Sequence, residues 1–79
     1  MITARQSRAA HALLGWTQET LADKAQVSLT ALKRLESESA LPVYESTRDQ
    51  VRRAFEANGV VLLQSDRGEG VMLVRTAKT

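Results

Sequence analysis

The sequence predicts a small, mainly α domain of four to five helices that ends in a β-hairpin. Two observations support this prediction. Between residues 3 and 58, good N-cap residues precede segments whose apolar residues recur at helical spacing. After Gly59 the chain changes to two short apolar runs with a glycine-containing stretch between them, which is typical of a hairpin. We therefore assign residues 1–59 to a helical domain and residues 60–79 to a hairpin and tail of the same domain.

Composition limits the size and the location of the protein. The chain has 79 residues, of which 43% are hydrophobic, enough for one domain with one core. A core of this size is often marginal alone, and oligomerisation is a common remedy. The absence of cysteine excludes disulfides and suits a reducing compartment, so we expect a cytoplasmic protein. No apolar run approaches the roughly 18 residues of a membrane span, and no signal peptide is expected.

The first helix is expected to begin at a capping box, Thr3-Ala4-Arg5-Gln6, and to end near Leu14. Gly15 can then take the left-handed conformation that closes many helices. Trp16 is expected to pack under a later helix as a core aromatic. The buried side of the first helix is predicted to consist of Ala10, Leu13 and Leu14.

The stretch from Thr17 to Glu36 is predicted to form two short helices joined by a tight turn. Thr17 is a good N-cap for the first of them, and Ser28 is a good N-cap for the second. Small residues at Ala22 and Ala25 allow two helices to cross closely at a steep angle. This arrangement is the one that a helix-turn-helix motif requires.

This stretch resembles the XRE/Cro-like (lambda-repressor-like) family of DNA-binding regulators. The resemblance rests on LLGWTQETLADKAQVS followed by LKRLE, and it extends from Ile2 to about Gly59. It implies a helix-turn-helix domain that binds specific DNA sequences. The positions that match in one register are Gln18, Leu21, Ala22, Ala25, Val27, Leu32, Leu35 and Glu36.

Two residues depart from the family pattern. Gln26 occupies a turn position where the family usually has glycine, because the backbone there adopts a positive φ. His11 occupies a position where the family often has an arginine that pairs with the glutamate found here at Glu36. The resemblance therefore implies a His11–Glu36 pair, and the alternative is a partly exposed histidine without a strong partner.

The DNA-facing residues follow from the docking geometry of such motifs, in which the second helix enters the major groove with its N-terminal residues towards the bases. Arg34 is the best candidate for a bidentate contact with guanine. The family's equivalent of Gln18 grips a phosphate, so the same role is expected here. Leu29 has two interpretations, contact with thymine methyl groups or burial in the core, and we favour the first. The full predicted set is Gln18, Ser28, Leu29, Thr30, Ala31, Lys33 and Arg34; for Lys33 and Arg34 the alternative is a solvated charged face.

The helix after this motif is expected to follow a polar loop from Ser37 to Ser46, which contains Pro42. A second capping box, Thr47-Arg48-Asp49-Gln50, is predicted to open a helix that runs to about Asn58. Its inward residues are predicted to be Val51, Ala54 and Phe55, and its outward residues Arg48, Arg52 and Arg53.

The hairpin is predicted from strands at residues 60–64 and 71–75, with Asp66 to Gly70 as the loop between them. Both strands are apolar on both faces, although only one face can cover the helices. The remaining face or edge is expected to meet the same hairpin of a second subunit about a two-fold axis. That contact would place two DNA-reading helices about 34 Å apart. The predicted dimer interface comprises Val60, Val61, Leu62, Leu63, Val71, Met72, Leu73 and Val74.

Catalysis is not expected, because the chain has one histidine, no cysteine and no suitably placed pair of carboxylates. We likewise expect no metal site and no cofactor. The sequence favours a sequence-specific transcriptional regulator that binds double-stranded DNA as a homodimer, with repression of a palindromic operator as the expected activity. The alternative is an antitoxin-like or adaptor protein that uses the apolar hairpin to bind another protein.

Overall fold

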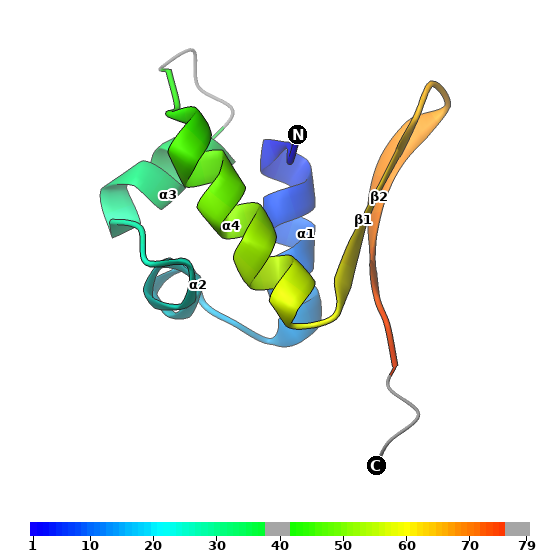
Figure 1. Cartoon of the computed structure of the whole chain (residues 1–79), viewed down its shortest axis with the longest axis horizontal. Helices are drawn as coiled ribbons and strands as arrows, with labels where there is room; N and C mark the ends of the chain where they lie inside the picture. Colours follow the sequence, from blue (N-terminus) through cyan, green and yellow to red (C-terminus); the bar gives the residue numbers. More distant parts are fainter. Residues whose placement is uncertain (38–41, 76–79) are drawn as a thin grey trace.

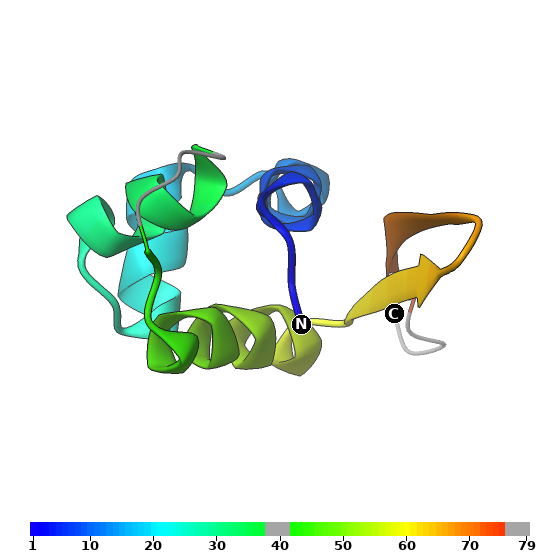
Figure 2. The same ribbon diagram turned by 90° about the horizontal axis from the view of Figure 1, so that it is seen from above.

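The computed structural model describes residues 1–37 and 42–75, and its elements follow the order that the sequence predicts. In chain order the elements are α1 (Ala4–Leu14), α2 (Gln18–Ala25), α3 (Leu29–Glu36), α4 (Glu45–Ala57), β1 (Val60–Ser65) and β2 (Gly68–Leu73). Figure 1 shows α1 between the other helices and the hairpin, and Figure 2 shows the same order from above. The prediction of a mainly helical domain with a C-terminal hairpin is confirmed for this part of the chain. None of the described helices is both long and apolar enough to cross a membrane.

The expected caps define the first three helices. The hydroxyl of Thr3 accepts a hydrogen bond from the backbone N–H of Gln6 at 3.1 Å, and the Gln6 side chain accepts one from the Thr3 N–H at 3.1 Å. This reciprocal pair is the predicted capping box. Gly15 ends α1 with a φ of 72°, which costs glycine little. Thr17 and Ser28 cap α2 and α3 through their hydroxyl groups, as predicted.

The core lies between the four helices and the first residue of β1. Trp16 stacks on Phe55 of α4 with 6.3 Å between ring centroids, which confirms its predicted packing. Leu13 differs from the prediction, because it is 48% exposed on the outer side of α1. The buried hydrophobic residues are Ile2, Ala10, Leu21, Ala22, Ala25, Leu32, Leu35, Val51, Ala54, Phe55 and Val60.

The connection between α2 and α3 is closed by a left-handed residue. Gln26 has a φ of 58°, the positive value expected at this position. The N–H of Val27 donates to the carbonyl of Ala22 at 3.0 Å, and that of Gln26 donates to Asp23 at 3.2 Å. This pair of hydrogen bonds is a Schellman motif, which satisfies carbonyls that the end of a helix leaves open.

The start of α4 differs from the prediction. The helix begins at Glu45 after Tyr44, so the predicted capping box from Thr47 to Gln50 is wrong. Thr47 is instead 7% exposed inside the first turn, and its N–H donates to the carbonyl of Tyr44 at 3.0 Å. Arg48, predicted to point outward, reaches across to the carbonyl of Ile2 at 2.8 Å. Residues 38–41 of the predicted loop lie outside the described residues.

The hairpin has a tighter turn than expected. Gly68, Glu69 and Gly70 were predicted to be loop residues, but they pair with Ser65, Gln64 and Leu63 and belong to β2. Only Asp66 and Arg67 connect the strands. The two glycines lack the β-branched and apolar signal of a strand, so pairing with β1 rather than intrinsic propensity makes this segment extended.

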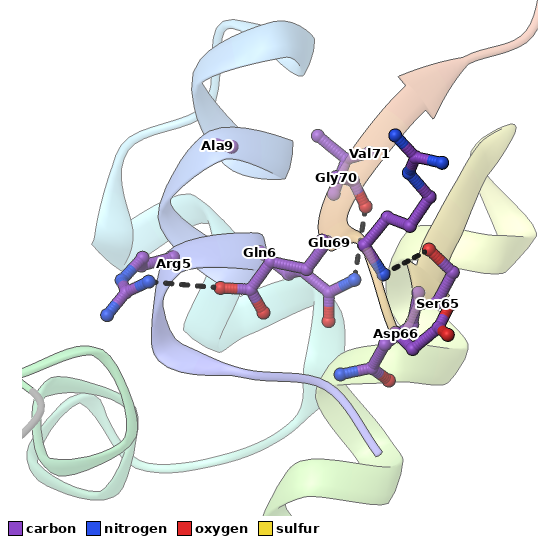
Figure 3. A pocket seen from close by; sticks show the side chains of 11 residues that line it. Arg5, Gln6, Ala9, Ser65, Asp66, Glu69, Gly70 and Val71 are labelled. Carbon is purple, nitrogen blue, oxygen red and sulfur yellow. Dashed lines mark hydrogen bonds and ion pairs between the residues drawn. The ribbon is translucent and has the colours of Figure 1, made fainter.

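The hairpin is fastened to α1 by the buried side chain of Gln6. Its amide nitrogen donates to the carbonyl of Leu63 at 2.9 Å and to that of Gly70 at 3.0 Å, so it contacts both strands. Glu69 adds a hydrogen bond from the Thr3 hydroxyl at 2.8 Å and an ion pair with Arg5 at 3.4 Å. Figure 3 shows the Gln6 and Arg5 contacts at the junction of α1 and β2. The same glutamine therefore caps α1 and orients the hairpin.

Candidate nucleic-acid interface

The exposed side of α3 presents a short polar and cationic surface. The side chains of Thr30, Lys33 and Arg34 are exposed, as the predicted DNA-reading set requires. Ser28 is also exposed, and its hydroxyl accepts the N–H of Ala31 at 3.0 Å. This hydrogen bond fixes the start of α3 and so fixes where the exposed side chains point.

Two members of the predicted set are less accessible. Ala31 is half-buried, and Leu29 is half-buried with its side chain packed against the core. The packing of Leu29 thus agrees better with burial in the core than with the contact to thymine methyl groups that we favoured. The i, i+3 spacing of Leu29 and the fully buried Leu32 explains this orientation, because such residues share a helix face.

Gln18 lies at the start of α2, and its side chain is held by a hydrogen bond to α3. Its amide nitrogen donates to Oε1 of Glu36 at 3.0 Å. An amide nitrogen carries two hydrogens, so Gln18 retains one donor for a second acceptor. The orientation of Gln18 is therefore set by the last residue of α3.

Glu36 is the centre of a polar cluster that joins the first three helices. The residue is 4% exposed, and its carboxylate accepts hydrogen bonds from Gln18, from the hydroxyl of Ser7, and from Nε2 of His11 at 3.0 Å. The guanidinium of Arg8 donates to the backbone carbonyl of Glu36. A buried carboxylate needs hydrogen-bond donors, and this cluster supplies them from three side chains. The predicted His11–Glu36 pair is confirmed.

A residue that the sequence did not single out lies beside α3. Tyr44 is 79% exposed and lines a shallow cleft of about 190 Å³ together with Arg34. Tyrosine offers an apolar ring and a hydroxyl, which suits contact with a sugar–phosphate backbone. Its only sequence signal was a lone aromatic residue in a polar loop. The other residues that line the cleft are Ser28, Thr30, Ala31, Pro42, Val43 and Thr47.

The remaining basic residues near the predicted motif contact the protein itself. Arg5 pairs with Glu69, and Arg8 donates to Glu36. The Nζ atom of Lys24 lies 5.7 Å from the centroid of the Trp16 ring, a cation–π contact made by an exposed residue. The charge available for a polyanion on α3 is therefore that of Lys33 and Arg34.

A larger cleft, of about 640 Å³, lies between α1 and the tip of the hairpin (Figure 3). Its polar lining is partly occupied by internal contacts, since Arg5 pairs with Glu69 and Gln6 binds both strands. The described residues include no group of three or more histidine, cysteine or acidic side chains that could hold a metal ion.

The predicted interface residues of the hairpin divide into two faces. Val60, Leu62 and Val71 pack on the helical core, with Val60 fully buried. The opposite face exposes its apolar side chains to between 38% and 48%. These exposed residues are Val61, Leu63, Met72 and Val74. Leu73 pairs with Val60 on the helix-facing side, although it is 37% exposed.

No model of a known protein family matches this chain, and no curated protein sequence matches it significantly.

Proposed function

We propose that this protein is a sequence-specific DNA-binding transcriptional regulator in which α2 and α3 act as a helix-turn-helix motif. The observation that carries the proposal is the arrangement around α3. Ser28 caps the start of α3, and the helix exposes Thr30, Lys33 and Arg34. Its last residue, Glu36, holds Gln18 at the start of α2.

This arrangement suits a two-part contact with duplex DNA. The major groove is wide enough to admit one α-helix, and base edges there distinguish all four base pairs. Arg34 can make two hydrogen bonds to guanine, and Thr30 can contact a neighbouring base through its hydroxyl or methyl group. Gln18 and the free N–H groups at the start of α2 can hold a phosphate at the same time.

The phosphate-contacting and base-contacting side chains have different roles because their chemistry differs. Contacts to phosphates carry no sequence information but fix the position of the helix on the duplex. Lys33 adds charge without a fixed geometry, whereas the planar guanidinium of Arg34 favours one acceptor pattern. Tyr44 extends the contact surface on the side of α3 that faces the beginning of α4. Repression is the expected outcome when such a protein occupies a promoter.

Selection of bound DNA from a random duplex pool tests the proposal. The wild-type protein should enrich one short motif, and its affinity should fall steeply as salt rises, because phosphate contacts release counterions. The variant Arg34→Ala should change or lose the motif. A matched control is Arg67→Ala, which removes an exposed arginine from the hairpin tip and should leave the motif unchanged. Absence of any enriched sequence with the wild-type protein would refute the proposal.

A further inference from the structure

The outer hairpin face, consisting of Val61, Leu63, Met72 and Val74 with Ser65, Gly68 and Gly70, is an open apolar surface. Val61 and Met72 form a cross-strand pair, and Leu63 is opposite Gly70. Side chains alternate along a strand, so these residues share one side of the sheet. The four apolar side chains are 38%, 46%, 48% and 43% exposed in the order named.

The hairpin is not free to turn this face inward. Its other face already packs on the core through Val60, Leu62 and Val71. Gln6 holds both strands at 2.9 and 3.0 Å, and Glu69 is bonded to Thr3 at 2.8 Å. Figures 1 and 2 show the outer side of the hairpin directed away from all four helices. A single chain therefore leaves the outer hairpin face in water.

We propose that the outer hairpin face packs against the same face of a second copy of this chain, and that the contact forms chiefly when both copies occupy neighbouring DNA sites. The second half of this statement rests on the proposed function. In this proposal the two hairpins associate by packing face to face and not by pairing their strand edges.

The absence of charge on this face is compatible with a second copy as the occupant. None of the seven residues of the outer hairpin face is charged, so the face offers nothing to a phosphate backbone or to a charged partner. An uncharged apolar face is complementary to itself, because a two-fold axis brings no like charges together. Residues of both signs, such as Asp66 and Arg67, lie at the tip of the hairpin, beside this face and not within it.

Area determines the strength of the contact. Four half-exposed apolar side chains amount to a few hundred Å² at most, whereas a standard-size interface buries about 800 Å² per partner. Free subunits should therefore associate weakly. Two copies on one duplex are at an effective concentration on the order of millimolar, where a small contact of this kind is sufficient. The resulting interaction appears as cooperative binding to DNA with two half-sites.

Met72→Lys tests the contact, because Met72 is at the centre of the face and 48% exposed, so the variant should fold. The added positive charge cannot weaken DNA binding by repulsion. Gln64→Lys is the matched control, since Gln64 lies on the same hairpin with its side chain on the other side of the sheet. Leu63→Lys serves as a second variant if Met72→Lys is not folded by circular dichroism.

Two measurements decide the outcome. In sedimentation equilibrium, the wild-type and Gln64→Lys proteins should show a concentration-dependent monomer–dimer equilibrium, and Met72→Lys should remain monomeric. On duplexes with one or two selected half-sites, the wild-type protein should bind its second site about tenfold or more tightly than the first. Met72→Lys should bind one half-site like the wild type but show no cooperativity.

The inference is overturned if Met72→Lys associates as the wild type does, or if the wild type stays monomeric and fills two half-sites independently. If no DNA sequence is selected, the proposed function is refuted. The contact between two copies is then tested by sedimentation equilibrium alone. A wild type that is monomeric but binds a different protein through Met72 also overturns the inference, in favour of an adaptor.

Discussion

The imidazole ring of His11 lies between two hydrogen-bond acceptors. Its Nε2 is 3.0 Å from Oε1 of Glu36, and its Nδ1 is 3.1 Å from the backbone carbonyl of Trp16. Through these two contacts the ring joins α1 to the end of α3 and to the connection before α2.

Replacement of His11 by alanine should lower the free energy of unfolding by about 1–3 kcal/mol, because it removes a donor from the buried carboxylate of Glu36. His11→Arg is the matched control and should retain most of the stability, since a guanidinium also supplies hydrogen-bond donors. Urea denaturation measures both. Equal stability of His11→Ala and the wild type would show that the pair contributes nothing.

Gln26→Gly should raise the free energy of unfolding by up to about 1 kcal/mol, because Gln26 has a φ of 58° and glycine adopts such values without strain. Lys33→Gly is the control, placed in the exposed face of α3, where glycine should cost about 1 kcal/mol. Denaturation midpoints of the two variants should move in opposite directions. A lower midpoint for Gln26→Gly would mean that the glutamine side chain makes a stabilising contact.

Arg34→Ala should weaken binding to the selected motif by about 1–3 kcal/mol and relax the preference at one base pair in each half-site. The loss is specific because a bidentate guanine contact disappears while the phosphate contacts remain. Fluorescence anisotropy with duplexes substituted at each position measures it, with Arg67→Ala as the control for a lost positive charge. Unchanged affinity and preference would exclude Arg34 as a base-reading residue.

The ion pairs of Asp49 in the middle of α4 should give the protein a small acid sensitivity. The hydrogen bond from Arg52 holds the pKa of Asp49 below its ordinary value of 3.8, and the charge of Arg53 at 2.9 Å acts in the same direction. Because the folded pKa is depressed, the contribution of Asp49 to stability is present above the unfolded pKa and is lost as pH falls through the folded value.

The exposure of these side chains makes the effect small and sensitive to salt. Asp49→Asn should be slightly less stable than the wild type near neutral pH, and the gap should close in strong acid. Carbon NMR of the Asp49 carboxyl group provides the direct measurement. A midpoint of titration at or above 3.8 would contradict the assigned pairing.

The features that could be predicted from the sequence are mostly local. Thr3, Gly15 and Ser28 mark helix ends because each one acts on backbone groups a few residues away. The positive φ of Gln26 and the His11–Glu36 pair were expected only because the resemblance supplied a register. Exposure of the outer hairpin face followed from strands that are apolar on both sides.

The features that could not be predicted depend on contacts between distant segments. The sequence predicts Gln6 as a capping residue only, yet its amide also donates to carbonyls in both strands of the hairpin. Thr47 resembles an N-cap, but tertiary packing buries it inside the first turn of α4. The role of Tyr44 beside Arg34 depends on the path of the chain before α4, which no local pattern specifies.

In the proposed function, α3 and the start of α2 contact DNA. The most direct measurement is NMR of nitrogen-15-labelled protein during titration with the selected duplex, which reports on the backbone N–H of each residue. The largest changes are predicted at Gln18 and over residues 28–34, with smaller changes near Tyr44. Changes concentrated in the hairpin, or no changes at all at a concentration that saturates binding, would contradict the claim.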